Sequence, residues 1–180
     1  MKRRGFTVVE LIITITIMGI LLTLAVVNLS SSQANARDSE RKGDAEAIAT
    51  HMETYYNNVT SDSTTTGFYG SGGTYMGTID INATDLAANL PEMDPKSLRA
   101  PGVSTASPIS LVIATNNVQS PAGITPIPTK TNDVYVYQPI AKDASLCTNP
   151  ALALPDCRKF NLYYYQETTN TVQMITSKNQ

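Results

Sequence analysis

GFTVVELIITITIMGILLTLAVVNL, residues 5–29 of this 180-residue chain, is almost entirely apolar and carries a single charge, at Glu10. A helix rises ~1.5 Å per residue, so positions 8–29 would extend about 33 Å, close to the thickness of the bilayer hydrocarbon. The stretch therefore predicts a membrane-spanning helix over residues 6–29.

The residues before this stretch predict its orientation. Lys2, Arg3 and Arg4 form a short basic leader, and basic residues favour the cytoplasmic side of a membrane, so we expect everything after Leu29 to be exported. An ordinary secretory signal is the alternative, because Ala34-Asn35-Ala36 fits a small-x-small cleavage pattern. The apolar run is too long for it, since the core of such a signal has about 7 to 15 residues.

Glu10 needs an explanation, because a carboxylate at the centre of a span costs about 2.5–3.5 kcal/mol by insertion scales, and less near the interface. If the chain were cut after Gly5, the new α-amino group on Phe6 would lie about one helical turn from Glu10. That amino group could pair with Glu10 of an adjacent copy. An interfacial glutamate that the membrane tolerates is the alternative.

The basic leader, Gly5, the segment Phe6-Thr7-Val8-Val9-Glu10 and the apolar run closely resemble the class III signal of type IV pilins and pseudopilins. The resemblance implies cleavage between Gly5 and Phe6, N-methylation of Phe6 and a role for Glu10 in docking subunits. It implies four partners: the prepilin peptidase/methyltransferase, further copies in a helical homopolymer, a membrane-embedded assembly platform, and the inner membrane before assembly.

The helix is expected to continue past Leu29, because no proline or strong breaker occurs before Asn57. One apolar stripe at helical spacing should lie on the rest of the protein: Ala45, Ile48, Ala49, Met52, Tyr55 and Tyr56. We expect Glu40, Asp44 and Glu53 to lie on the opposite face. The predicted organisation is a leader (1–5), a membrane or filament-core helix (6–29), the exported half of that helix (30–58) and a globular head (59–180).

Four runs in the head have the composition of strands: residues 109–115, 133–138, 159–166 and 171–176. We expect an α+β, type IV pilin-like fold in which the long helix packs on a four-stranded antiparallel sheet, with tyrosines on the other face of the sheet. Residues 59–77 are expected to form a surface loop, and residues 84–90 a short helix.

The remaining motifs favour structure over chemistry. Cys147 and Cys157 are expected to form a disulfide, since the domain is exported. His51, the only histidine, has no convincing nucleophile to serve, so we predict no enzyme activity, no cofactor and no metal site. Arg158 and Lys159 could contact DNA or a surface ligand, although two basic residues are also typical of a solvated strand edge.

The sequence therefore favours a structural subunit of a type IV pilus-like filament, a single-pass membrane protein as precursor and extracellular once assembled. A pseudopilin of a type II secretion system shares every motif used above. A single-span membrane protein with a small extracellular binding domain is the alternative from a different class.

Overall fold

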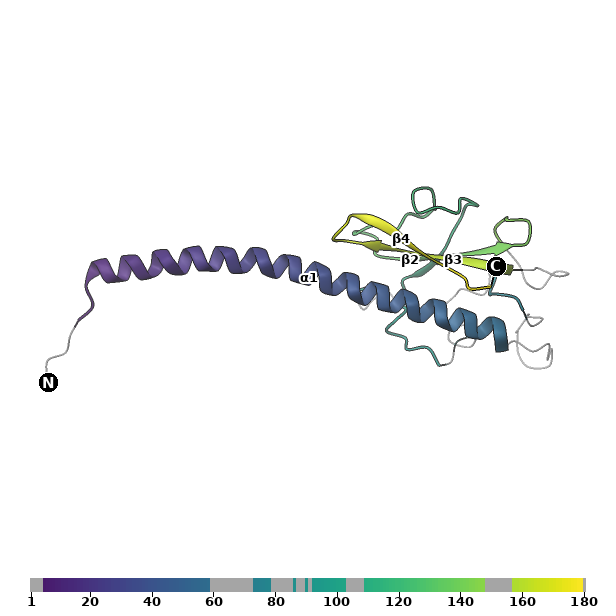
Figure 1. Cartoon of the computed structure of the whole chain (residues 1–180), viewed down its shortest axis with the longest axis horizontal. Coiled ribbons are helices and arrows are strands. Elements are labelled where there is room, and N and C mark those ends of the chain that lie inside the picture. The colour runs from purple at the N-terminus through teal and green to yellow at the C-terminus, as the bar shows by residue number, and fades with distance from the viewer. Residues whose placement is uncertain are drawn as a thin grey trace.

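In the computed structural model a single long helix carries a four-stranded sheet at one end (Figure 1). Helix α1 spans Val8–Asn58, and its carboxyl half lies against the sheet while its amino half projects away. The strands are β1 (Leu111–Ile113), β2 (Tyr135–Ala141), β3 (Cys157–Gln166) and β4 (Thr171–Thr176). This is the predicted α+β architecture.

The structure describes residues 5–58, 73–78, 86, 90, 92–102, 109–147 and 157–179, without the side chains of Val27, Asn28 and Asn58. Most of the predicted loop (59–77) and most of the predicted helix (84–90) lie outside these residues. Residues 73–78, Leu86 and Leu90 are the described parts of those two segments.

The sheet is mixed, so the prediction of a fully antiparallel sheet is wrong. Its order is β1-β2-β3-β4, and β3 is antiparallel to both β2 and β4. Strand β1, however, runs parallel to β2, with Leu111 opposite Tyr135. Residues 114–134 connect the two strands across the face of the sheet that points away from α1, where Ile124 packs on Val136. Such a crossover carries the chain back to the starting end of β1, so β2 runs in the same direction as β1.

Strand β2 is longer than the sequence predicts. The expected end at Gln138 precedes Pro139, which has no N–H for the ladder. In the structure Pro139 lies opposite Phe160, and its carbonyl accepts a hydrogen bond from the Cys147 N–H at 3.0 Å. The strand therefore continues to Ala141, because the Pro139 carbonyl still accepts a hydrogen bond and β2 stays paired with β3 along its other edge.

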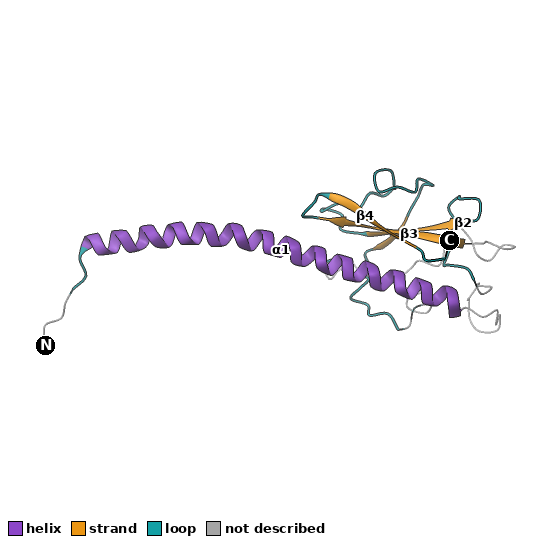
Figure 2. Ribbon diagram, viewed as in Figure 1, coloured by secondary structure: helices purple, strands orange, loops and turns teal. Residues whose placement is uncertain are grey.

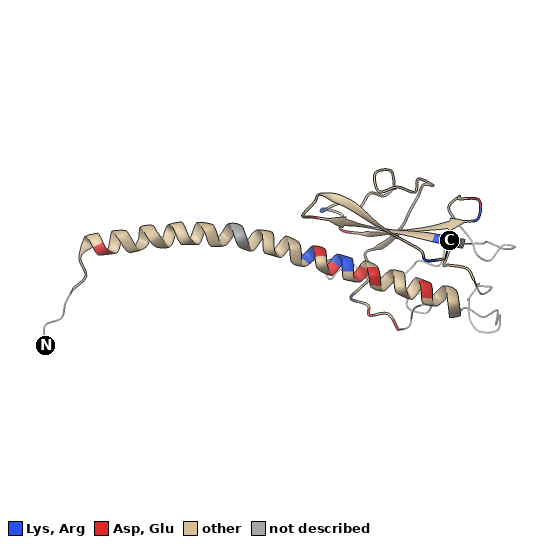
Figure 3. Ribbon diagram, viewed as in Figure 1, with Lys and Arg blue, Asp and Glu red and all other residues tan. Residues whose placement is uncertain are grey.

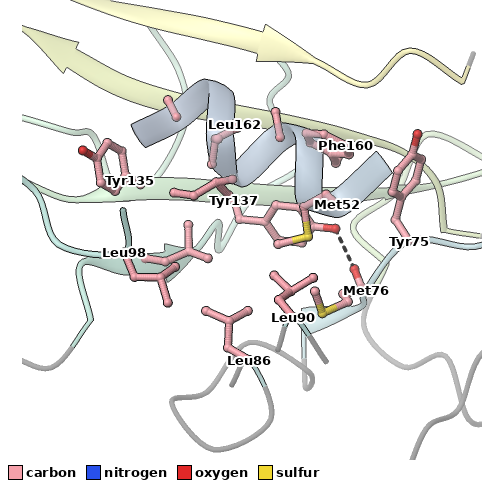
Figure 4. Close-up of a cluster of buried hydrophobic side chains, with 14 of the residues drawn as sticks. Met52, Tyr75, Met76, Leu86, Leu90, Leu98, Tyr135, Tyr137, Phe160 and Leu162 are labelled. Carbon is pink, nitrogen blue, oxygen red and sulfur yellow. Dashed lines mark hydrogen bonds between the residues drawn. The ribbon is translucent and has the colours of Figure 1, made fainter. Parts of the chain in front are cut away.

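The main core lies between α1 and the sheet (Figure 4). Ala45, Ile48 and Met52 from the predicted stripe are fully buried there. Tyr75 and Met76 are equally buried, although the sequence analysis assigned them to a surface loop. Figure 4 shows both beside the helix, so the residues after the Gly-rich stretch complete the core.

Tyrosines lie on both faces of the sheet, which corrects the expectation that they all face away from α1. Tyr135, Tyr137 and Tyr164 belong to the core beneath the helix, whereas Tyr163 lies in the smaller cluster on the outer face. Tyrosine tolerates burial when its hydroxyl finds a partner. The Tyr137 hydroxyl donates to the Met76 carbonyl at 2.9 Å, the dashed line in Figure 4.

Candidate functional site

The amino half of α1 projects away from the head (Figure 2), and its large apolar side chains are exposed. Phe6, just before the helix, is 82% exposed, and the large apolar side chains described from Val8 to Leu29 are exposed as well. The helix is long and apolar enough to cross a membrane. Contiguous apolar surface of this size marks a site that lipid or protein covers.

Hydroxyl groups within the span are already satisfied by the helix itself. Thr14 donates to the Leu11 carbonyl at 2.8 Å, Thr16 to the Ile12 carbonyl at 2.7 Å and Thr23 to the Ile20 carbonyl at 2.7 Å. An unsatisfied polar group in hydrocarbon costs several kcal/mol. These bonds let the polar residues of the span enter an apolar environment.

Glu10 is the one charged residue between positions 5 and 36 (Figure 3). It lies in the first turn of α1, where the helix dipole favours a negative charge. Thr7 caps this turn, since its hydroxyl oxygen accepts from the Glu10 N–H at 3.3 Å. Within the described part of the chain, no ion pair involves Glu10, so its carboxylate is available to a partner.

Gly5 and Phe6, the residues of the predicted cleavage junction, lie before the first helical residue, Val8. Both are exposed. The bond between them is therefore outside the hydrogen-bonded ladder of α1. A protease could reach it without unwinding the helix.

A charged cluster joins the middle of α1 to the head, where Figure 3 shows the blue and red bands of the helix reaching the sheet. Arg37 contacts Glu167, in the β3–β4 turn, through two hydrogen bonds of 2.9 and 2.8 Å. Arg41 makes a similar fork to Asp133 at 2.9 and 3.1 Å. Lys130 adds a 2.6 Å ion pair to Glu167.

Asp38 anchors the β3–β4 turn to the helix. Its carboxylate accepts from the N–H groups of Glu167 (2.7 Å) and Thr168 (2.8 Å) and from the Thr168 hydroxyl (2.6 Å). Burial alone would raise the pKa of this carboxyl, but the bonds from Thr168 and Glu167 and the charge of Arg41 lower it overall. Asp38 is therefore ionised at neutral pH, and its carboxylate fixes the β3–β4 turn to α1.

Helical periodicity does not indicate this cluster, and the expectation that Asp44 and Glu53 lie on the face opposite the apolar stripe is wrong. Arg41 is in fact only 2% exposed, and Asp44 accepts from the Tyr135 hydroxyl at 2.9 Å. Glu53 is buried and accepts from the Tyr75 hydroxyl (2.8 Å) and the Lys178 N–H (2.7 Å). Burial and hydrogen bonding to Glu53 raise the pKa of Tyr75 to about 12.

Cys147 and Cys157 form a disulfide, with their Cα atoms 5.7 Å apart. Their carbonyls accept hydrogen bonds from Thr78 (3.1 Å) and Tyr75 (2.8 Å) respectively. The disulfide region thereby supports residues 73–78, which carry the buried Tyr75 and Met76.

The remaining candidates are not brought together. The Nδ1 atom of His51 lies 2.9 Å from the Ala47 carbonyl, one turn earlier on its own helix. In the described ranges, no group of three or more His, Cys, Asp and Glu side chains could hold a metal ion. Arg158 and Lys159 are exposed at the start of β3.

Comparison with known proteins points to the amino-terminal segment. Residues 1–26 match a family model described as the prokaryotic N-terminal methylation motif. The type IV major pilin protein PilA of Myxococcus xanthus (strain DK1622) is 36% identical over 55 residues, which cover 31% of this chain and 25% of that relative. No solved structure matches the chain.

Proposed function

We propose that this chain is a structural subunit of a type IV pilus-like filament, which the N-terminal methylation motif matched by residues 1–26 and the likeness to a type IV major pilin support. A prepilin peptidase/methyltransferase cuts the precursor after Gly5 and methylates the new amino terminus at Phe6. Residues 6–29 then hold the subunit in the inner membrane until an assembly platform adds it to the filament. The subunit performs no catalysis.

The exposed apolar half of α1 is the observation that carries this proposal. Its side chains pack against nothing in the described chain, so folding alone leaves them in contact with solvent. Lipid can cover them in the precursor, and the same helices of other copies can cover them in a filament, because both surroundings are equally apolar. One surface thus serves both the membrane-anchored and the assembled state.

The lone carboxylate supports assembly over simple anchoring. Glu10 has no ion-pair partner among the described residues, and a charge in an apolar span is most stable when it is paired. The amino group that cleavage creates on Phe6 offers such a partner on the neighbouring copy. Pairing between copies would set how far each helix advances into the filament.

This proposal assigns one role to each of four segments of the chain. Residues 1–5 are the leader, 6–29 the membrane and filament-core helix, 30–58 the exported half of the helix, and 59–180 the head. The charged cluster holds the head firmly on the exported half, so a filament built from the helices would carry the heads outward.

Mass spectrometry of purified filaments tests the processing step. We expect the amino-terminal peptide to begin with methylated Phe6, whereas the Gly5→Asp precursor should keep Met1. An intact Met1, or a start at Arg37, in wild-type protein would contradict the proposal.

An antibody to the head, used on intact cells, separates the competing functions. Labelled surface fibres support the pilus-like filament. A processed subunit without surface fibres supports the type II secretion pseudopilin, and an unprocessed, monomeric subunit supports the anchored binding domain.

A further inference from the structure

A pocket of about 380 Å³ lies in the head, near the carboxyl end of α1. Tyr56 of α1 and Asn179 of the carboxyl-terminal segment form part of its wall. Lys142, Arg158 and Lys159 also line it. The described lining residues include three cations and no carboxylate, in a chain whose net charge is −2.

The sheet brings these cations together from separate parts of the sequence. Lys142 directly follows the last residue of β2, and Arg158 and Lys159 belong to the first residues of β3. Antiparallel pairing places Ile140 opposite Lys159 and shifts register just beyond it. The basic side chains therefore gather at one end of the β2–β3 pair.

Two of these cations have no carboxylate partner among the described residues, unlike the basic residues that join α1 to the head. Arg37, Arg41 and Lys130 all contact carboxylates. Neither Lys142 nor Lys159 forms an ion pair with any residue that the structure describes, and both are exposed. The nearby carboxylate of Asp143 instead accepts from the N–H (3.0 Å) and hydroxyl (2.5 Å) of Ser145.

We propose that this pocket binds a tetrahedral oxyanion group, phosphate or sulfate. A phosphate or sulfate group has more acceptor oxygens than a carboxylate and can carry a higher negative charge. It can therefore contact several cations at once, which a single carboxylate does less well. The pocket is within the range of about 300–1,000 Å³ typical of ligand sites, so it has room for an organic group beside the anion, next to the Tyr56 ring.

Isothermal titration calorimetry on the full chain in an uncharged detergent at low salt tests the proposal. The probes are inorganic phosphate, glucose 6-phosphate and glucose. We expect saturable binding of both phosphates and none of glucose. If glucose 6-phosphate binds more tightly than inorganic phosphate, the ligand is a phosphate ester. If the two bind equally, the ligand is the free anion.

The double variant Lys142→Gln/Lys159→Gln should weaken phosphate binding at least tenfold. The double variant Lys42→Gln/Lys96→Gln is the matched control, because it removes the same charge from exposed positions outside the pocket. It should bind phosphate like the wild type. Absence of saturable phosphate binding, equal weakening in the control, or equal binding of glucose would overturn the proposal; thermal unfolding checks that the variants are folded.

Discussion

Glu167 is a single residue whose ionised form is strongly stabilised at the junction of helix and head. Hydrogen bonds with Arg37 and Lys130 lower the pKa of its carboxyl to about 2, from an ordinary value of 4.5. A carboxyl whose pKa is lower in the folded state stabilises the fold above its unfolded pKa. That stabilisation declines as the pH falls from about 4.5 and is gone near pH 2.

The variant Glu167→Gln should therefore unfold at a lower temperature than the wild type at pH 7, by roughly 2–4 °C. The difference should shrink as the pH is lowered from about 4.5 towards 2, because the wild-type carboxylate becomes protonated there. Thermal unfolding by circular dichroism over pH 2–7 measures both curves. The exposed Glu92→Gln serves as control, and a constant difference between Glu167→Gln and wild type would refute the assignment.

The residues of this cluster show what sequence patterns leave out. Asp38 and Arg41 occur in a run of mixed charges that is typical of a solvated helix face, and the periodicity of apolar residues says nothing about distant carboxylates. Their partners, Asp133 and Glu167, are about 90 and 130 positions away. Only the packing of α1 on the sheet reveals that these charges are buried and paired.

At the scale of elements, α1 contains a weak point in its docked half. Gly43 is exposed, and a Cβ added there would meet no atom within 4 Å. Glycine in a helix interior is less stable than alanine by about 1 kcal/mol, because it loses more backbone freedom on folding. Gly43→Ala should therefore raise the free energy of unfolding of the head by up to that amount.

Urea unfolding of the full chain in detergent measures this change. Gly102→Ala is the contrasting control, since Gly102 has a φ of +95°, which favours glycine. It should destabilise the protein. A destabilised Gly43→Ala variant would show that the helix needs glycine at this position for a reason other than its backbone.

Other features of the elements were predictable to different degrees. The apolar run and its stripe predict α1 to within two residues of its observed ends, and the strand-like runs locate β3 and β4 within two residues. Alternation does not report strand direction, however, so the parallel pairing of β1 required the path of residues 114–134. The burial of Tyr75 and Met76 could not be predicted, because the polar, Gly-rich stretch before them is typical of a surface loop.

Across the whole molecule, the two halves of α1 have opposite requirements. The carboxyl half is fixed by a buried core and by paired charges within one chain. The amino half is not covered by any described part of the chain, and its single carboxylate forms no ion pair with a described residue. The described part of the head is therefore held together within one chain, whereas the amino half of the helix exposes an apolar surface of the kind that lipid or protein covers.

Glu10→Ala separates these two environments. Removing a charge from an apolar span makes membrane insertion more favourable, so the variant should remain in the membrane fraction. If Glu10 pairs with the amino terminus of a neighbouring copy, filament yield should fall severalfold, because the advancing subunit loses its charge partner. Quantitative immunoblotting of membrane and sheared-filament fractions measures both effects in one culture. Thr14→Ala removes a hydroxyl bonded within its own helix and should assemble normally; a wild-type filament yield from Glu10→Ala would show that the carboxylate does not guide assembly.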